Sequence, residues 1–262
     1  MKKILFAFFA VMSFIHPMAS EAALKSEMIE YKSGDAVLEG YLVYDDATQN
    51  KRPGVIVVHD WMGQGEYGQK RAQMLAELGY VALAIDIYGK GIRPKNTDEA
   101  SQQATIYKSD RALLRQRAQA GLEVLKKHPL VDSAHIAAIG YCFGGTTVLE
   151  MARARMDLAG VVSFHGGLQT PNPMETQNVK AKVLVLHGAD DPYVPPQEVA
   201  DFQKEMNAAK ADWQMISYSG AVHSFTRKDA GDDNSKGAAY NAKADERSWR
   251  AMNDFFSEIF IK

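Results

Sequence analysis

Six short apolar runs, spread over most of the chain, constrain the fold more than any other feature of the sequence. Each run is nearly continuous and rich in β-branched residues, as strands are when both faces of a parallel sheet are covered. Segments with helical spacing separate the runs, so strand and helix alternate along the chain. The runs occupy residues 54–59, 80–86, 135–141, 159–165, 182–188 and 213–219. We therefore predict an α/β domain built around a mostly parallel sheet.

Two further patterns complete the predicted architecture. Residues 26–46 alternate apolar and polar side chains around Ser33-Gly34-Asp35, which predicts an antiparallel hairpin at the start of the sheet. Three later segments carry apolar stripes at helical spacing, and we assign these stripes to the core. They are Met74, Leu75 and Leu78; Leu114, Ala118, Leu122 and Leu125; and Trp249, Met252, Phe255, Phe256 and Ile259. Helices on both faces of such a sheet give three layers, with ligands bound outside the carboxyl ends of the strands.

A leader precedes this domain. Lys2 and Lys3 are followed by the apolar run ILFAFFAVMSFI and then by small residues, which is the order found in secretory signal peptides. The apolar run is too short to span a bilayer as a helix, and the small residues favour cleavage after Ala22. We predict a signal peptide over residues 1–22, a single domain over residues 23–262, and a periplasmic or secreted protein.

The charge balance narrows the range of partners. Removing the leader's Lys2, Lys3 and Glu21 from 30 basic and 32 acidic residues leaves 28 and 31, a net charge near −3. The charges form no block of one sign, which argues against nucleic acid or an anionic membrane surface as a partner. We expect a small-molecule substrate, no membrane contact after leader cleavage, and a monomer or small homo-oligomer.

Cys142 is the single cysteine of the chain, so no internal disulfide can form. One interpretation is a small buried hydrophobe, and the other is a reactive thiol. The local sequence favours the thiol, because Gly140 and Gly144 flank Cys142 between a predicted strand and a predicted helix. This is the pattern of a nucleophile elbow, with Cys in place of Ser. A helix that begins near Phe143 would also favour the thiolate through its positive end.

A thiol nucleophile needs a base, and the base needs a group that orients it. Asp191 and His223 each follow the carboxyl end of an apolar run, downstream of Cys142. Nucleophile, acid and histidine in this order are typical of α/β-hydrolases. Asp190 is a close rival of Asp191 for the acid, and the alternative for His223 is an ordinary surface histidine.

A glycine-rich turn after the first apolar run has two incompatible interpretations. Gly63, Gly65 and Gly68 spell the dinucleotide-binding pattern, with Asp86 at the expected distance downstream. However, residues 59–62 separate the strand from the first glycine, whereas a dinucleotide fold leads directly into it. We interpret the glycines as turn residues, and a nucleotide-dependent oxidoreductase remains the less favoured alternative.

In the hydrolase interpretation, the same turn supplies half of an oxyanion hole. The backbone N–H of Trp61 would join the N–H of Phe143 to stabilise the developing oxyanion. No cofactor is needed for this chemistry.

At this point the motifs show a resemblance to a known family. GYCFGG, HGADDPYVP and AVHSFTR, with VIVVHDWMG and LAIDIYGKG upstream, resemble the dienelactone hydrolase family over about residues 27–260. The resemblance implies an α/β-hydrolase fold and a thiol-dependent enzyme that opens lactone rings. It also implies that Cys142 is the nucleophile, His223 the base and Asp191 the orienting acid.

The resemblance further implies Arg227 as a clamp on a substrate carboxylate, a task that suits the planar, bidentate guanidinium. Two positions depart from the family pattern. Asp60 stands where members usually carry Glu as a partner of the resting thiol, so we expect Asp60 to modulate the thiol. Lys90 stands where members that open dienelactone carry a second arginine, with Arg93 nearby. Read alone, Arg227 and Arg93 are ordinary solvated arginines.

Three predicted strand-end histidines, His59, His165 and His187, raise the question of a zinc site. Neither an H-x-x-x-H spacing nor a second cysteine is present, so we expect no metal. The polar segment 228–241 beside His223 is either a solvated connection or a substrate lid. We predict hydrolysis of an ester or lactone, carboxylated in our expectation, through a thioester intermediate, and the alternative is a non-catalytic binding protein on the same fold.

Overall fold

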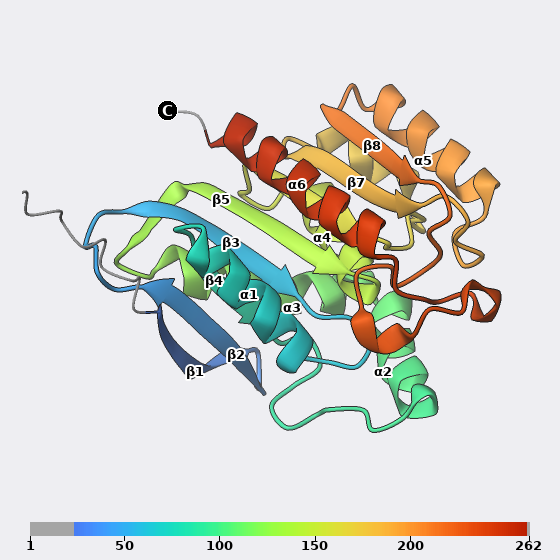
Figure 1. The fold of residues 1–262 in the computed structure, drawn as a ribbon. Coiled ribbons are helices and arrows are strands. Elements are labelled where there is room, and N and C mark those ends of the chain that lie inside the picture. The colour runs from blue at the N-terminus through green and yellow to red at the C-terminus, as the bar shows by residue number, and fades with distance from the viewer. Residues whose placement is uncertain (1–23, 261–262) are drawn as a thin grey trace, which may run out of the picture.

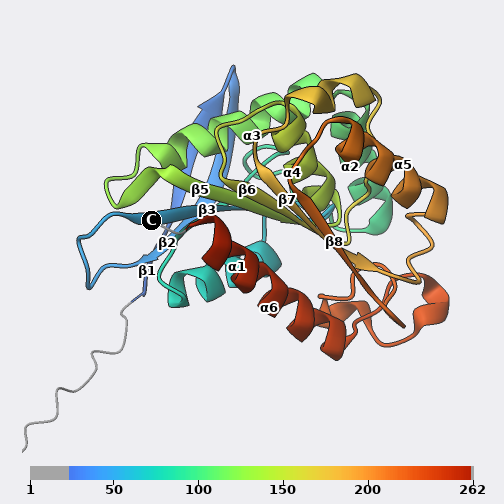
Figure 2. The same ribbon diagram turned by 90° about the horizontal axis from the view of Figure 1, so that it is seen from above.

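The computed structural model describes residues 24–260, which form one eight-stranded sheet covered by helices on both faces (Figures 1 and 2). The strand order is β1-β2-β4-β3-β5-β6-β7-β8. The strands are β1 (Leu24–Ser33), β2 (Ala36–Asp45), β3 (Arg52–Val58), β4 (Val81–Ile85), β5 (Val131–Tyr141), β6 (Gly160–Phe164), β7 (Lys182–Gly188) and β8 (Trp213–Tyr218). All six runs predicted to be strands are confirmed.

The sheet begins antiparallel and continues parallel. β1 and β2 form the predicted hairpin, whose turn contains Gly34 with a φ of +60°, and β2 then pairs antiparallel with β4. The other pairings in the described sheet, from β4 through β3 to β8, are parallel. The predicted mostly parallel sheet with an antiparallel start is therefore confirmed.

Helices cover the two faces unequally. α2, α3, α4 and α5 lie on one face, and α1 and α6 lie on the other (Figure 2). Their bounds are α1 (Glu66–Glu77), α2 (Thr97–Ser109), α3 (Arg111–Lys126), α4 (Phe143–Arg153), α5 (Pro196–Ala208) and α6 (Ala242–Ile259). Short 3-10 turns follow β6 and β8, at η1 (Pro173–Asn178), η2 (Lys228–Ala230) and η3 (Asn234–Lys236).

Most residues of the predicted core stripes are buried, whereas Met74, Trp249 and Ile259 are half-buried and Leu78 is exposed. Leu75 of α1, Leu122 of α3 and Met252 of α6 are fully buried. Leu78, however, is 49% exposed, so its assignment to the core was wrong. The reason is that α1 ends at Glu77, and Leu78 caps the helix instead of continuing its buried face.

The predicted leader, residues 1–22, lies outside the described residues, and its export role stays a prediction. Between residues 24 and 260, no helix combines the length and apolar character that a bilayer span requires. The carboxyl ends of the parallel strands lie along one edge of the sheet, and the loops that follow them carry the candidate site.

Candidate active site

Cys142 occupies a strained turn between β5 and α4. Its backbone φ is +55°, an unusual value for a residue with a side chain. A Cβ on Gly140 would lie 2.1 Å from the Gly144 carbonyl oxygen, and one on Gly144 would lie 2.3 Å from the Val58 carbonyl oxygen. Only glycine fits at these two positions. The strand-turn-helix geometry of a nucleophile elbow is therefore present.

The structure brings Cys142, His223 and Asp191 together in one chain of contacts. The Nε2 atom of His223 lies 3.0 Å from the Cys142 Sγ, and its Nδ1 atom lies 2.8 Å from the Asp191 Oδ2. The other carboxylate oxygen of Asp191 accepts the Tyr193 N–H at 2.9 Å, which fixes the orientation of the carboxylate. Asp191 is buried whereas Asp190 is exposed, so Asp191 is the acid that contacts His223.

The electrostatic environment holds His223 in its charged form. Burial by itself lowers the pKa of His223, but the neighbouring Cys142 thiolate and the hydrogen bond to Asp191 outweigh burial and raise this pKa to about 10. His165 packs edge-on against His223 with ring centroids 5.2 Å apart. Burial keeps the pKa of His165 well below its usual value, so His165 is neutral. At neutral pH His223 therefore carries a positive charge beside the Cys142 Sγ.

Two backbone N–H groups are available beside the thiol. Phe143 is the first residue of α4, so its N–H has no partner within the helix. The N–H of Trp61 makes no hydrogen bond with any residue in the range 24–260. The Tyr88 hydroxyl donates to the Trp61 carbonyl oxygen at 3.0 Å and fixes this part of the loop. Both predicted oxyanion donors thus have free N–H groups.

A cavity of about 330 Å³ opens next to the thiol. Cys142 and His223 line it together with Trp61, as a substrate site requires. Further lining residues include Lys108, Thr146, Gly167, Gln169, Glu198 and Ala238. Ala238 belongs to the polar segment 228–241, which pairs with the backbone of His223 through Gly237 and Ala239. This segment is therefore part of the cavity wall.

A family match covers the chain from within β2 to the end of α6. The sequence profile of the dienelactone hydrolase family matches residues 38–260, which is most of the chain. This chain belongs to the dienelactone hydrolase family. The α/β-hydrolase fold and the assignment as a carboxylic ester or lactone hydrolase are confirmed by this membership.

Two similar proteins illustrate the breadth of this family. A crystal structure of a dienelactone hydrolase-like promiscuous phosphotriesterase from metagenomic libraries is 39% identical, with a TM-score of 0.87. The match covers 91% of this chain and 100% of that one. A protein of Saccharolobus solfataricus named "Putative carboxymethylenebutenolidase" is 25% identical over 265 residues, covering 88% of this chain and 98% of the relative.

In this dienelactone hydrolase family member, Asp60 and Arg227 form an ion pair with each other. Arg227 also forms a bidentate pair with Asp229 and stacks over the Tyr67 ring, 4.9 Å from its centroid. The predicted modulator of the thiol and the predicted carboxylate clamp are thus bound to one another. Asp60 also accepts the Met62 N–H at 2.8 Å.

The other two predicted substrate-binding residues, Arg93 and Lys90, both lie within 4 Å of the Glu39 carboxylate but differ in what else they contact. Arg93 lines a second cavity, of about 410 Å³, together with Asp60 and Arg227. Lys90 instead turns to the β1–β2 hairpin, where it pairs with Glu30. None of the three predicted cationic residues lines the cavity that contains the thiol.

The alternative nucleotide site has no support in the geometry of the turn. Gly63 closes a turn onto the Asp60 carbonyl oxygen and has a φ of +88°. Asp86 is fully buried and accepts the N–H groups of Tyr88 and Gly89, so its carboxylate shapes its own loop. Gly63 is a turn residue as we predicted, whereas Gly65 directly precedes α1 and Gly68 lies within that helix.

Within residues 24–260, no group of three or more histidine, cysteine or acidic side chains is arranged to hold a metal ion. His59 and His165 make separate contacts. His59 stacks on Phe143 with centroids 5.7 Å apart, and His165 bonds to the Thr226 hydroxyl at 2.8 Å.

Several residues of the site were not singled out from the sequence. Tyr88 holds the loop of Trp61, and Lys108 and Glu198 line the thiol cavity. Lys108 and Glu198 lie on α2 and α5, two helices whose apolar stripes were too weak to be assigned. For Tyr88, the position directly after a strand end was the available signal.

Proposed function

We propose that this protein hydrolyses a carboxylic ester or lactone through Cys142, His223 and Asp191, with a thioester intermediate. The observation that carries this proposal is the continuous chain from the Cys142 Sγ through both ring nitrogens of His223 to Asp191, at 3.0 and 2.8 Å. Nucleophile, base and orienting acid at these distances are the geometric requirement for covalent catalysis.

In the first half of the reaction, His223 already holds the proton of the Cys142 thiol, and the Cys142 thiolate attacks the substrate carbonyl. The N–H groups of Phe143 and Trp61 stabilise the tetrahedral oxyanion, and each such donor contributes about 3 kcal/mol in comparable sites. The carbonyl C–O bond to the alkoxide then breaks. His223 protonates the alkoxide, which in a lactone stays attached to the acyl chain.

In the second half, His223 removes a proton from water, and the resulting hydroxide attacks the thioester carbonyl. The C–S bond breaks, the carboxylic acid leaves, and the thiolate–imidazolium pair is restored. Asp191 keeps the imidazole in the required tautomer through both halves because it accepts the Nδ1 hydrogen.

We further propose that the substrate carries a carboxylate and that Arg227 binds it. Arg227 already holds the carboxylates of Asp60 and Asp229. It lines the second cavity with Asp60 and Met62, the two neighbours in sequence of Trp61 in the thiol cavity. A substrate carboxylate would replace one of these partners. Lys108 is the competing cation, because it lines the thiol cavity itself.

The test compares hydrolysis of p-nitrophenyl acetate and of a carboxylated unsaturated lactone by the mature protein. We expect activity on both, loss of activity in Cys142→Ala, and loss after iodoacetamide. In Arg227→Met, KM for the lactone should rise about tenfold while that for the neutral ester changes little, because only the lactone uses a charge-assisted pair. Lys108→Met is the matched control and should leave both KM values unchanged.

Three results would contradict these proposals. Hydrolysis that survives in Cys142→Ala would remove the thiol mechanism. If neither substrate is hydrolysed and Cys142 does not react with iodoacetamide, a non-catalytic binding protein is favoured. A loss of lactone preference in Lys108→Met instead of Arg227→Met would move carboxylate recognition to the thiol cavity.

A further inference from the structure

One wall of the thiol cavity is a short segment after β6, Gly167 to Gln169. This segment lies against the helix that carries the nucleophile. A Cβ on Gly166, directly before the segment, would lie 2.7 Å from the backbone carbonyl carbon of Gly145 in the first turn of α4. The wall therefore begins in direct contact with the elbow of Cys142.

Side chains, not strand pairing, hold the polar backbone groups of this wall. The hydroxyl of Thr146 donates to the Gly167 carbonyl oxygen at 3.0 Å. Arg153 donates to the Leu168 carbonyl oxygen at 2.8 Å. On the opposite side, Glu198 Oε1 accepts the N–H of Leu168 at 2.5 Å and that of Gln169 at 3.2 Å. The position of the wall therefore depends on side chains of α4 and α5.

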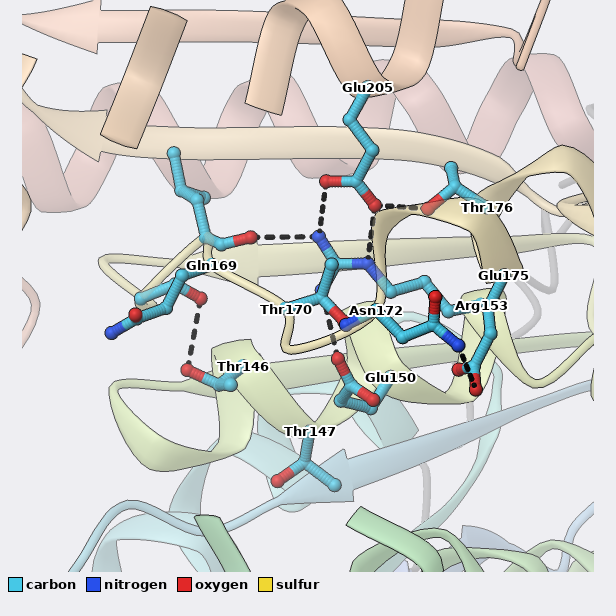
Figure 3. Close-up of polar contacts among 12 residues, drawn as sticks. Thr146, Thr147, Glu150, Arg153, Gln169, Thr170, Asn172, Glu175, Thr176 and Glu205 are labelled. Carbon is cyan, nitrogen blue, oxygen red and sulfur yellow. Dashed lines mark hydrogen bonds and ion pairs between the residues drawn. The ribbon is translucent and has the colours of Figure 1, made fainter. Parts of the chain in front are cut away.

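The hydrogen bond from Arg153 to Leu168, which we call the inner tie, is part of a buried charge cluster (Figure 3). Arg153 is 2% exposed and bonds to Glu150 at 3.0 Å and to Glu205 at 2.8 and 2.9 Å. Glu150 in turn accepts two hydrogen bonds from Arg115. Removing Arg153 would leave buried carboxylates without their cation, which destabilises proteins strongly. The inner tie is thus rigid and unsuitable for a test by substitution.

The hydrogen bonds from the wall to Glu198, which we call the outer tie, have different surroundings. Glu198 is half-buried in the first turn of α5, where a carboxylate is favoured by the helix dipole. It lines the thiol cavity beside Thr146, and one of its oxygens takes both N–H bonds from the wall. Replacing Glu198 would therefore free the wall without burying an unpaired charge.

We propose that Glu198 is a positioning residue that fixes the Gly167–Gln169 wall and thereby limits the size of the group that fits beside the Cys142 thiol. The proposal rests on the proposed thiol chemistry at Cys142. Its effect is on which molecules reach the sulfur, because Glu198 contacts the wall and not the reacting atoms.

The test measures size selectivity in two ways. The first compares kcat/KM for p-nitrophenyl acetate and hexanoate, and the second compares alkylation of Cys142 by iodoacetamide and by N-phenylmaleimide. Alkylation needs no turnover, so a failure of the proposed hydrolysis leaves this second measurement intact. In Glu198→Ala, both bulky-to-small rate ratios should rise about fivefold, since a freed wall admits larger groups.

Two control variants separate bonding from charge and from general stability. Glu198→Gln keeps an oxygen that accepts the same two N–H groups, so its ratios should stay within about twofold of the parent protein. Gln197→Ala, on the neighbouring exposed residue, should match the parent. A merely structural role would lower the melting temperature in Glu198→Ala and leave the ratios unchanged. Unchanged ratios, or equal ratios in Glu198→Gln and Glu198→Ala, would overturn the proposal.

Discussion

Two aspartates in this site have the same backbone turn and the same position at a strand end, but they pair with different cations. Asp191 and Asp60 both follow the carboxyl ends of strands, and each accepts the N–H of the residue two positions on, at 2.9 and 2.8 Å. Each then offers its Oδ2 atom to a cation from the loop after β8, which is His223 for Asp191 and Arg227 for Asp60.

The difference lies in the cation. Histidine can release its proton near neutral pH, so the Asp191–His223 pair can take part in proton transfer. Arginine stays charged, so the Asp60–Arg227 pair is a permanent ion pair. Arg227 also has a second carboxylate partner in Asp229. The same turn therefore holds a titratable imidazole at one strand end and a permanently charged guanidinium at the other.

The largest expected effect comes from breaking the first pair. In Asp191→Asn, the amide would no longer fix the Nδ1–H tautomer of His223, so kcat/KM should fall on the order of 1,000-fold. Steady-state hydrolysis of p-nitrophenyl acetate measures this loss. Asp190→Asn is the matched control, because Asp190 is exposed and does not contact His223. A comparable loss in Asp190→Asn would identify Asp190 as the acid.

A second prediction concerns the pKa of His223 in the same pair. Cys142 helps to raise the pKa of His223 to about 10, so His223 holds its proton below that pH and loses it above. In Cys142→Ala, burial continues to lower this pKa while the thiolate no longer opposes it. Proton binding to His223 should weaken at least about tenfold, with the titration moving to lower pH. NMR titration of the imidazole measures the shift, and an unchanged midpoint would contradict the thiolate–imidazolium pair.

The sequence predicted the contact of Asp191 with His223 but not the contact of Asp60 with Arg227. Strand-end positions and the flanking glycines of Cys142 restrict where the thiol, acid and histidine can lie, because parallel strands end at one edge. The contact of Asp60 with Arg227 joins residues 167 positions apart through the orientation of two side chains. No spacing rule in one sequence gives that orientation.

The same limit applies to the remaining cations and to part of the fold. Lys90 and Arg93 follow the same strand, yet only Arg93 lines the cavity of Asp60, because Lys90 reaches Glu30 on the edge hairpin. The apolar runs predicted every strand of the parallel part of the sheet, since burial on both faces requires continuous apolar sequence. The helices α2 and α5 bury few apolar side chains, and their sequences gave a correspondingly weak signal.

The smallest expected effect comes from the second pair. Burial raises the pKa of Tyr88, and both Cys142 and Asp60 raise it further, so the two negative charges act on the same hydroxyl. Asp60 and Cys142 therefore lie near one hydroxyl, and Arg227 pairs with the carboxylate of Asp60. In Asp60→Asn, the uncompensated Arg227 would favour the thiolate, and oxidation by hydrogen peroxide should become about two- to threefold faster.

A double variant decides whether the pair acts as a unit. Asp60→Asn combined with Arg227→Met removes both charges, so the oxidation rate should return close to that of the parent protein. Loss of the reactive thiol over time, measured at low ionic strength where screening is weak, gives the rates. If the single and double variants oxidise equally fast, Asp60 acts on the thiol independently of Arg227. A rate unchanged in Asp60→Asn would show that Asp60 serves its own turn and Arg227 without modulating Cys142.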